Sequence, residues 1–572
     1  MTPDRLLELY DRMANAPDAI SRLRRFVLDL AVHGKLVEQD PEDKPASELL
    51  KRIADEKVRL VKAGEIRKPR DLANGDELVP PFDIPSSWRW CRLDTVGAII
   101  GGGTPSAGDP ENFAEPGEGI PWLTPADLGG YRELSIEHGA RDLTKKGLAS
   151  SSATMMPAGT VLFTSRAPIG YVAIAANPIS TNQGFKSIVP YVADCSRFIA
   201  LAMQTFAPEI DAKAPGTTFK EVSGKIVAGV PFPLPPLAEQ RRIVAKVEEL
   251  MALLDQLEAA RAEREALRDQ LTRSSYARLT KASGELDAFQ ASASSTLTTL
   301  PALTTRPDQI KALRQTILDL AVRGKLVEQD PNDEPALNYL HDLDELPTGA
   351  RKQLRALDLS DPIGDLPASW VWLPLGAIIL GMGAGWSPQC ESHPRSSTEE
   401  WGVLKTTAVQ ALSFDLMQHK LLPSKLKPRP EFEAEVGDIL VTRAGPKNRV
   451  GVSCVVDRPC PRLMISDKLI RFHPVGGLSS RYIALTLNAG LTFDQIEAAK
   501  SGMAVMQMNI SQAKLRAITI PLPPVAEQHR IVAKVDALMA LCDELEAALT
   551  RSETTRARLL EASLHDVLEA AA

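Results

Sequence analysis

Three stretches of this sequence occur twice, and this repetition constrains the fold more than any other feature of the chain. The repeated stretches are PLPPLAEQRRIVAKV at 233–247 (PLPPVAEQHRIVAKV at 521–535), LDLAVHGKLVEQDP at 28–41 (LDLAVRGKLVEQDP at 318–331) and DIPSSWRW at 83–90 (DLPASWVW at 365–372). Their order is the same both times, whereas the sequence between them differs. This order predicts an internal duplication, in which each half has a helical opening, a variable body and a closing helix.

The closing segments carry the apolar spacing of a coiled coil. Apolar residues follow one another in steps of four and three, from Ile243 onward in the first copy and from Ile531 onward in the second. The proline before each stripe suits the first turn of a helix, where its missing N–H costs nothing. Two stripes related by a two-fold would pack antiparallel, with the opening helices, capped by Gly34 and Gly324, alongside. The alternative is that each long helix covers its own body.

The variable bodies mix strand-like and helical segments. In GTVLFTSRAPIGYVAIA at 159–175 and GDILVTRAGPKNRVGVSCVV at 437–456, β-branched and aromatic residues flank a Pro or Gly break, which is typical of two strands joined by a turn. The predicted fold class is α+β: two mixed α/β bodies separated by long antiparallel coiled-coil helices, with pseudo-two-fold internal duplication. The predicted boundaries are helical openings at 1–85 and 307–364, bodies at 86–236 and 365–524, long helices at 237–281 and 525–572, and a Ser-, Thr- and Ala-rich linker at 282–306.

Composition favours a soluble, cytoplasmic protein whose acidic charge lies outside the bodies. The 572 residues are 24% charged and 44% hydrophobic, no apolar run is long enough to cross a membrane, and the six scattered cysteines are expected to be reduced. A net charge of −7 argues at first against a nucleic-acid partner. However, body one (88–236) has 12 Lys and Arg against 13 Asp and Glu, and body two (370–524) has 17 against 12. The bodies are therefore neutral to basic.

No segment has the pattern of a catalytic or cofactor site. The chain lacks a G-x-x-x-x-G-K-[ST] phosphate loop, an H-E-x-x-H metal motif, and the Asn- or Asp-Pro-Pro-aromatic step with which amino-methyltransferases hold a flipped base. The three glycines at 101–103 lead into Thr-Pro rather than into a helix, so they indicate a loop and not a dinucleotide-binding turn. We therefore expect a chain without enzymatic activity of its own and without a bound metal or cofactor.

Polar and basic residues recur in the predicted loops of both bodies. Arg and Asn side chains read the edges of guanine and adenine, and Lys commonly contacts phosphate. The candidate DNA contacts are Thr104, Arg166, Thr181, Asn182, Gln183, Lys186, Thr218 and Lys220 in body one, and Arg443, Lys447, Asn448, Arg449 and Lys468 in body two. Any one of them can equally be an ordinary solvated loop residue. Their recurrence as clusters in two matched bodies favours contact with nucleic acid.

Over nearly its whole length the chain resembles the DNA-specificity subunit of a Type I restriction-modification enzyme. The resemblance rests on the duplicated plan and on four motifs: Pro-Leu-Pro-Pro-x-x-Glu-Gln-x-x-Ile at 233–243 and 521–531, GGGTPS at 101–106, IPWLTPADL at 120–128 and TNQGF at 181–185. Body two departs from the pattern, because GMGAGWSPQ at 381–389 replaces the Gly-x-Thr-Pro-Ser loop. Its recognition surface therefore need not copy that of body one.

The resemblance implies a division of labour within a larger complex. The two bodies would be target-recognition domains, each reading one half of a bipartite DNA sequence, while the long helices set their spacing and dock two methyltransferase subunits. Those partners would bind S-adenosylmethionine and methylate adenine, and restriction subunits would use ATP and Mg²⁺ to translocate and cut DNA. Candidate partner contacts are Leu36, Glu239, Gln240 and Ile243, with Leu326, Glu527, Gln528 and Ile531 in the second copy. The alternatives are a scaffold whose bodies bind protein, and an enzyme with an unrecognised site.

Overall fold

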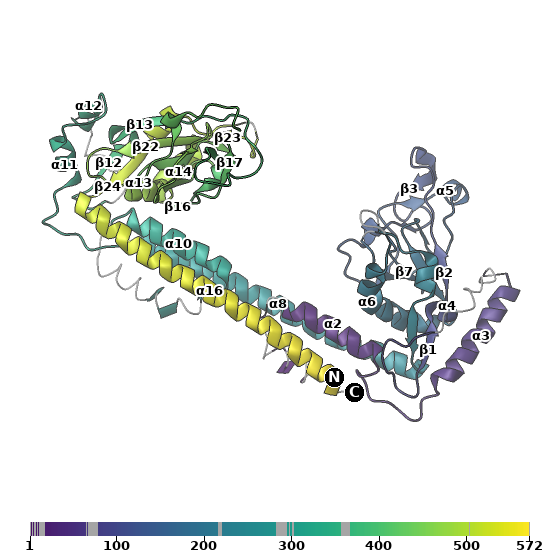
Figure 1. Ribbon diagram of the computed structural model, residues 1–572. Coiled ribbons are helices and arrows are strands. Elements are labelled where there is room, and N and C mark those ends of the chain that lie inside the picture. The colour runs from purple at the N-terminus through teal and green to yellow at the C-terminus, as the bar shows by residue number, and fades with distance from the viewer. Residues whose placement is uncertain are drawn as a thin grey trace. The chain divides into compact units, whose positions relative to one another are not determined.

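The computed structural model shown in Figure 1 divides the chain into two compact units. Unit 1 comprises Met1–Arg264 with Glu553–Ala572, and unit 2 comprises Glu265–Ser552. The structure describes residues 18–64, 78–166, 168–215, 220–281, 303–355, 366–502 and 504–570, with a few single positions at 2–16, 66 and 295–299. Most of the predicted linker 282–306, and the candidate Thr218, lie outside the described residues.

Unit 1 begins with helices and continues into a mixed α/β body. Its elements are α2 (Ala19–Val32), α3 (Ala46–Lys62), β1 (Arg89–Arg92), α4 (Leu93–Val96), β2 (Gly97–Gly101), β3 (Phe113–Ala114), β4 (Trp122–Leu123), β5 (Ser135–Ile136), β6 (Asp142–Leu143), α5 (Lys145–Ala149), β7 (Val161–Phe163), β8 (Val172–Ala175), β9 (Ser180–Thr181), β10 (Lys186–Pro190), α6 (Ser196–Ala212), α7 (Gly224–Ala228) and β11 (Pro231–Leu234), followed by α8 (Leu237–Lys281). A five-stranded sheet has the order β2-β10-β7-β8-β5, and α6 packs against β7 and β8.

Unit 2 repeats this plan with a larger body. Its elements are α10 (Pro307–Ala321), α11 (Ala336–Asp342), α12 (Ala350–Arg355), β12 (Val371–Pro374), β13 (Ile379–Ala384), β14 (Gly402–Leu404), β15 (Val409–Gln410), β16 (Ser413–Phe414), β17 (His419–Leu421), β18 (Ile439–Thr442), β19 (Ala444–Gly445), β20 (Ser453–Val455), β21 (Leu463–Met464), β22 (Leu469–Pro474), α13 (Ser480–Leu487), α14 (Gly490–Ala499), β23 (Met508–Asn509), α15 (Gln512–Ala517) and β24 (Thr519–Leu522), followed by α16 (Val525–Ala570). Its main sheet has the order β13-β22-β18-β20, and a second sheet has the order β17-β14-β21.

Each body is closed by a pair of antiparallel strands built from the repeated motifs. In unit 1 strand β1, which begins within Ser-Trp-x-Trp, pairs with β11, which ends within Pro-Leu-Pro-Pro. In unit 2 β12 pairs with β24 in the same way. The variable sequence therefore starts and ends at one place in each unit. The predicted strand–turn–strand segments are confirmed as β7 and β8 in body one and as β18 and β20 in body two. The mixed α/β character of both bodies is confirmed as well.

The apolar stripes of the long helices are buried against the opening helices within each unit. In unit 1 the first part of α8, including Ile243 and Leu250, shares a core with α2, and in unit 2 Ile531 of α16 shares a core with α10. Each opening helix ends as predicted: Gly34 and Gly324 have φ values of +70° and +66°, the left-handed conformation that glycine adopts without strain. Both α8 and α16 contribute residues to both units.

Candidate nucleic-acid interface

In body one the segments 101–104 and 181–184 meet at the end of the β2–β10 strand pair. The Gly103 N–H donates a hydrogen bond to the carbonyl oxygen of Thr181 over 2.9 Å. A Cβ atom on Gly102 would lie 2.2 Å from that same oxygen, so only glycine allows this approach. We call this contact the loop junction of body one. It brings together two of the motifs on which the family resemblance rests.

Four of the predicted DNA contacts lie at this loop junction, and the structure separates them into two kinds. Thr104 and Gln183 are exposed, and the Thr104 hydroxyl donates to Oε1 of Gln183. Asn182 is half-buried, and its Oδ1 accepts the N–H of Gly184 over 2.8 Å, so that oxygen shapes the turn. The Thr181 side chain has no exposed surface. The assignment of Thr181 as a DNA contact is therefore wrong, because burial keeps its side chain from any base or phosphate.

The basic candidates of body one are paired with acidic residues. Arg166 forms an ion pair with Glu221 over 3.0 Å, and Lys186 lies 3.8 Å from the same carboxylate. Burial lowers the pKa of Lys186. Lys220 pairs with Asp211 over 3.1 Å. A phosphate at this surface would compete with these carboxylates, so the local positive potential is weaker than the sequence indicated.

Body two forms a second loop junction from an unrelated sequence, between the segments 385–387 and 465–468. The Trp386 N–H donates to the carbonyl oxygen of Ile465 over 3.0 Å, and a Cβ on Gly385 would lie 1.9 Å from that oxygen. Beside it the Ser387 hydroxyl donates to Oδ1 of Asp467, and the Asp467 N–H donates back to Ser387 Oγ over 3.1 Å. Both side chains are exposed.

A second pair of backbone bonds fixes the correspondence between the two junctions. Ser165 N–H donates to the Gly184 carbonyl over 2.7 Å, and Arg443 N–H donates to the Lys468 carbonyl over 2.7 Å. Arg443 and Lys468 thus stand where body one has a buried serine and a glycine. Sequence analysis missed Ser387 and Asp467 because GMGAGWSPQ does not resemble GGGTPS. An alignment of TNQGFK (181–186) with ISDKLI (465–470) would have placed Asp467 opposite Gln183. The buried residues Phe185, directly before β10, and Leu469, the first residue of β22, anchor that alignment.

The other basic candidates of body two lie on the turn after β19. Lys447 and Asn448 are exposed there, as predicted for residues that meet a ligand. Arg449 instead points into its own domain: its guanidinium donates to Gln410 Oε1 over 2.8 Å and to the Thr406 carbonyl over 2.8 Å. These internal bonds hold the turn against the segment 406–410, so the half-buried guanidinium already has partners within body two, and a DNA contact of Arg449 stays a prediction.

Glu239 and Glu527, two of the residues predicted to bind partner proteins, instead accept hydrogen bonds from within their own units. In unit 1 the buried Glu239 at the start of α8 accepts the indole N–H of Trp88 over 2.9 Å and the side-chain N–H of Gln39 over 2.5 Å. One turn later Arg242 binds Asp43 over 2.7 Å. The three repeated sequence motifs therefore converge on one carboxylate. We call Gln39, Trp88 and Glu239 the glutamate clamp of unit 1.

Unit 2 builds the same clamp from Gln329, Trp370 and Glu527. Glu527 accepts from Trp370 over 2.9 Å and from Gln329 over 2.6 Å, and Arg530 binds Asp333 over 2.6 Å. Burial raises the pKa of Glu239 and of Glu527, while their hydrogen bonds act in the opposite direction. The clamp joins an opening segment, a body and a long helix in each unit.

Most of the side chains predicted to contact partner proteins are buried within this chain. Seven of these side chains are at most 2% exposed: Leu36, Glu239, Gln240, Ile243, Glu527, Gln528 and Ile531. Leu326 is half-buried and packs on the core of α10 and α16. A side chain covered by its own chain cannot form the surface on which another protein docks. The repetition of these residues reflects a shared internal frame.

Comparison with known proteins identifies the family. A family model described as "Type I restriction modification DNA specificity domain" matches residues 85–264 and 432–552, which span most of both bodies and the first halves of both long helices. The chain belongs to this family. The specificity subunit of the Type I restriction enzyme EcoEI from Escherichia coli is 38% identical over 95% of this chain and 93% of its own length. The EcoAI specificity subunit from Escherichia coli is 28% identical over the same shares.

The chain is also similar to chains of known structure. One, from a study of the assembly and conformational transition of the type I R-M system, has 20% sequence identity and a TM-score of 0.49, covering 85% of this chain and 99% of that one. In the part of the chain that the structure describes, no helix is both long and apolar enough to cross a membrane.

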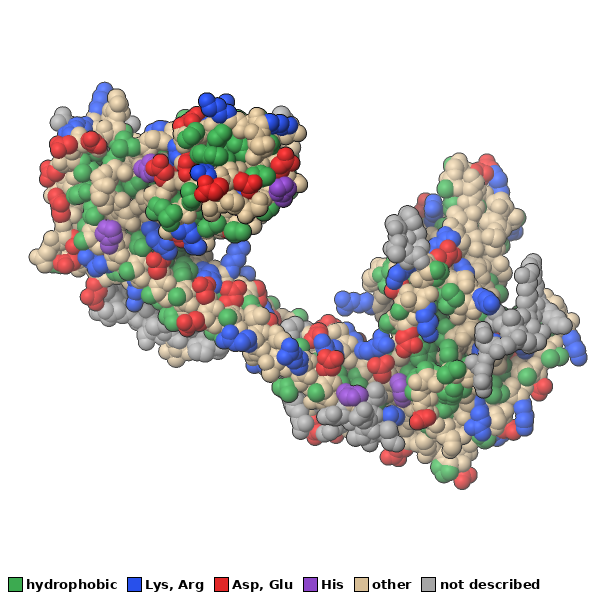
Figure 2. Space-filling view, viewed as in Figure 1, with side chains coloured by type: hydrophobic (Ala, Val, Ile, Leu, Met, Phe, Trp, Pro, Cys, Tyr) green, Lys and Arg blue, Asp and Glu red, His purple; other side chains and the backbone are tan. Residues whose placement is uncertain are grey.

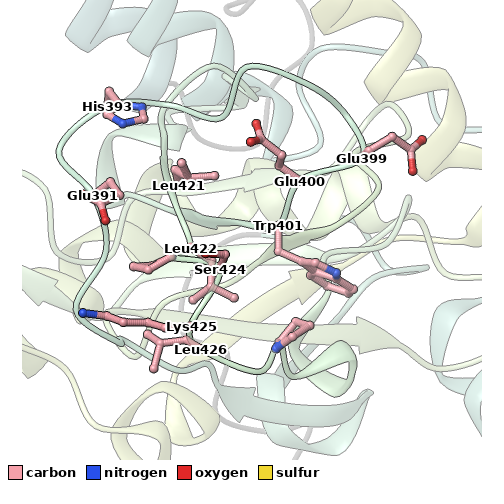
Figure 3. A pocket seen from close by; sticks show the side chains of 12 residues that line it. Glu391, His393, Glu399, Glu400, Trp401, Leu421, Leu422, Ser424, Lys425 and Leu426 are labelled. Atoms are coloured by element: carbon pink, nitrogen blue, oxygen red, sulfur yellow. The ribbon is translucent and has the colours of Figure 1, made fainter.

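Body two of the specificity subunit also holds a pocket of about 660 Å³, which differs in character from the loop junction. Its lining residues are Glu391, His393, Glu399, Glu400, Trp401, Leu421, Leu422, Pro423, Ser424, Lys425, Leu426 and Pro428. Figure 3 shows Glu391 and Lys425 on one side and Trp401 on the other. Three carboxylates against one lysine disfavour a phosphate or a nucleic-acid backbone. Among the described residues, no group of three or more His, Cys, Asp or Glu side chains is placed to hold a metal ion.

Charge on the visible face of unit 2 is mixed. Figure 2 shows Lys and Arg side chains interspersed with Asp and Glu. A mixed surface agrees with the small excess of basic residues counted in body two. The loop junction of body two is therefore a local cluster of basic and polar residues and not part of a continuous basic face. In it Arg443 and Lys468 are close to Ser387 and Asp467.

Proposed function

We propose that this chain selects the DNA sequence for a Type I restriction-modification complex in the cytoplasm, and that each body reads one half of a bipartite target. The observation that carries this proposal is the recurrence of the loop junction. Both bodies hold two loops in the same backbone arrangement, with Thr104 and Gln183 exposed in one and Ser387 and Asp467 in the other. One frame that displays different side chains suits a target whose two halves differ.

We further propose that α8 and α16 form an antiparallel coiled coil that sets the distance between half-sites, as part of a pseudo-two-fold arrangement. A helix of 45 residues such as α8 is about 68 Å long. Two recognition sites one turn of DNA apart are roughly 34 Å from each other. The helix is thus long enough to hold that separation. The burial of Leu254 of α8 and Leu560 of α16 in one core of unit 1, together with the recurrence of the glutamate clamp, supports this arrangement.

Two methyltransferase subunits and the restriction subunits are the proposed protein partners. The repeated opening segments remain the best candidate docking surface, but through their exposed residues. Glu38 and Glu328 are exposed at the same position of the two repeats, next to the clamp glutamines. Identical exposed residues in both units suit two copies of one partner. S-adenosylmethionine, ATP and Mg²⁺ would then bind in the partner subunits.

Exchange of one body tests the proposal. Replacing residues 93–230, between β1 and β11, by the corresponding body of a relative should change one half of the methylated sequence and leave the other half unchanged. The measurement is sequencing of methylated adenines in a host that carries the whole complex. A change in both halves, or in neither, would contradict the assignment of one body to one half-site. The purified chain alone, given S-adenosylmethionine and Mg²⁺, should neither methylate nor cut DNA.

Substitution of Arg443 tests the same surface at a single residue. Arg443 lies beside the loop junction of body two, and none of the described side chains forms an ion pair with it. If its guanidinium contacts a base, Arg443→Ala should cost roughly 1–3 kcal/mol of DNA binding and relax one position of one half-site. Equilibrium binding of the assembled complex to a panel of target variants measures both effects. Unchanged affinity and specificity would remove Arg443 from the interface.

A further inference from the structure

The two loop junctions present one side chain each at the same structural position, residue 183 in body one and residue 467 in body two. Each lies two residues after the carbonyl that accepts the junction hydrogen bond, from the N–H of Gly103 or Trp386. Each also precedes a residue whose carbonyl accepts the N–H of the neighbouring turn, from Ser165 or Arg443. Each is exposed and accepts a hydrogen bond from a hydroxyl on the facing loop, Thr104 or Ser387. The correspondence therefore extends from the backbone to the hydroxyl that orients the side chain.

The chemistry at this shared position differs. Gln183 carries a carboxamide, which combines a donor with an acceptor. The Thr104 hydroxyl takes one lone pair of Oε1 and leaves the second lone pair and the amide N–H groups available. Asp467 carries a carboxylate, which only accepts; Ser387 occupies Oδ1, and no described residue donates to Oδ2. The two bodies thus offer a donor–acceptor pair and a pure acceptor.

These two patterns match different base edges. A Gln side chain pairs with adenine through N6 and N7, whereas an Asp side chain accepts from the N4 amino group of cytosine and faces only acceptors on the guanine edge. We infer that residues 183 and 467 are equivalent base-reading positions, with Gln183 selecting adenine in one half-site and Asp467 selecting cytosine in the other. This inference rests on the proposed function. It goes beyond that proposal by naming one base in each half of the target.

The hydroxyls act as positioning residues. A Gln or Asp side chain on a surface loop samples several rotamers, and the bond from Thr104 or Ser387 restricts it to one. The same bond ties the two loops of each junction together, so removal of the hydroxyl has both a structural and a functional consequence. The test must therefore change the reading group itself while keeping its size and its partner hydroxyl.

The experiment uses the whole complex and sequencing of methylated adenines across the host genome. Asp467→Asn keeps the shape of the side chain and the acceptor for Ser387, but adds a donor. It should lower the preference for cytosine at one position of one half-site by roughly 10- to 100-fold, leaving every other position unchanged. Asp467→Gln should shift that same position towards adenine, and Gln183→Glu should lower the adenine preference at one position of the other half-site. Asp494→Asn, the same chemical change at an exposed site of α14, is the matched control and should leave the target unchanged.

The outcomes separate this inference from the function on which it rests. Methylation of a bipartite target by the unmutated complex, with no change in any Asp467 or Gln183 variant, would overturn the inference and leave the proposed function intact. Absence of any sequence-specific methylation by the unmutated complex would overturn both. If both Asp467 variants abolish methylation while size-exclusion chromatography shows that the complex still assembles, Asp467 holds the loop in place, and the inference is also overturned.

Discussion

The two units share an internal frame and differ at their exposed loops. In the glutamate clamps the bonds from tryptophan to glutamate are 2.9 Å in both units, and those from glutamine to glutamate are 2.5 and 2.6 Å. At the loop junctions the backbone bonds also recur, yet the side chains change from Thr and Gln to Ser and Asp. Contacts that join opening segment, body and helix have stayed fixed, whereas side chains that face outward have changed. The comparison supports the proposal that the frame holds the bodies while the loops select the target.

The frame itself shows one informative substitution. Trp88 meets the ring of Phe198 edge-on, and Trp370 meets Tyr482 in the same way, with ring centroids 6.1 and 6.3 Å apart. The Tyr482 hydroxyl is buried and donates to the Pro521 carbonyl over 2.9 Å. Burying a hydroxyl costs little free energy when the hydroxyl has a hydrogen-bond partner. Unit 2 can therefore have Tyr482 where unit 1 has Phe198, because the Pro521 carbonyl accepts the bond.

Replacing the clamp tryptophans tests the shared frame with the largest expected effect. Trp88 is 1% exposed and Trp370 is 7% exposed. Trp88→Ala should destabilise unit 1, and Trp370→Ala should destabilise unit 2, by about 3–5 kcal/mol each, because a large cavity forms and the clamp glutamate loses a donor. Hydrogen-exchange mass spectrometry measures the loss of protection unit by unit. Trp90→Ala, at a half-buried ring next to the clamp, is the control and should have a smaller effect. Equal loss of protection in both units after either substitution would contradict two separate frames.

The sequence predicted those parts of the molecule that depend on local pattern. The repeated segments, the helix ends at Gly34 and Gly324, and the strand pairs around each turn follow from periodicity and from glycine placement, and the structure confirms them. The partner contacts failed for a physical reason. Glu239 lies on the first turn of an amphipathic helix, where a carboxylate is ordinarily solvated. It is buried here and accepts hydrogen bonds from Trp88 and Gln39, which are far away in the sequence. Asp467 was missed because its role depends on a loop brought to it by the fold.

Gly34 and Gly324, which follow the opening helices, test whether a close approach to proline is equally strict in both units. A Cβ on Gly34 would lie 2.5 Å from Pro85 Cγ, and one on Gly324 would lie 2.5 Å from Pro367 Cγ, at positive φ in both cases. Gly34→Ala and Gly324→Ala should each cost about 2–4 kcal/mol, from backbone strain and from overpacking against the proline. Urea unfolding followed by circular dichroism gives the cost. Gly64→Ala is a matched control, because Gly64 has φ +71° but no neighbour within 4 Å, so only the backbone strain should remain. Equal costs at all three positions would show that the approach to proline adds nothing.

The clamp glutamates predict a pH dependence with a defined sign. The unfolded carboxyl titrates near 4.5, and burial raises the folded pKa of Glu239 and Glu527 above that value. Below about pH 4.5 both states are protonated, and the contribution of the group to stability is at its largest. As the pH rises from there through the folded pKa, the unfolded state is ionised while the folded state still holds its proton, so stability falls. The free energy of unfolding of the wild type minus that of Glu239→Gln should therefore decrease over this range, and Glu527→Gln should behave alike.

The glutamine variants also lose hydrogen bonds at every pH. A carboxamide offers one acceptor oxygen to two donors, so each variant should be about 1–3 kcal/mol less stable where the wild-type group is protonated or weakly ionised. Glu48→Gln provides a control of opposite sign. The bond from Lys51 lowers the pKa of Glu48, so the wild-type advantage there should grow as the pH rises and disappear as it falls. A wild-type advantage at Glu239 that grows with pH would show that the clamp stabilises the charged form.

The Arg–Asp ion pairs beside the clamps allow a comparison of the smallest expected energies in the two units. Arg242 binds Asp43 over 2.7 Å and Arg530 binds Asp333 over 2.6 Å, with 37% of each arginine side chain exposed and the carboxylates 8% and 9% exposed. Because the guanidinium groups are partly exposed, solvent screening limits how much these ion pairs stabilise the fold. We expect a coupling energy of about 0.5–1 kcal/mol from a double-mutant cycle to alanine, equal in the two units, and smaller at high salt.

A more exposed pair, which joins α6 to α8, supplies the reference for that measurement. Arg197 pairs with Glu248 of α8, and both side chains are more than half exposed. Its coupling should be about 0.2–0.5 kcal/mol, below that of Arg242 with Asp43, because both of its charges remain hydrated. If the two clamp-side pairs differ from each other by more than either differs from this reference, the repeated geometry does not carry equal energy. The duplication would then conserve the positions of these charges without conserving their contribution to stability.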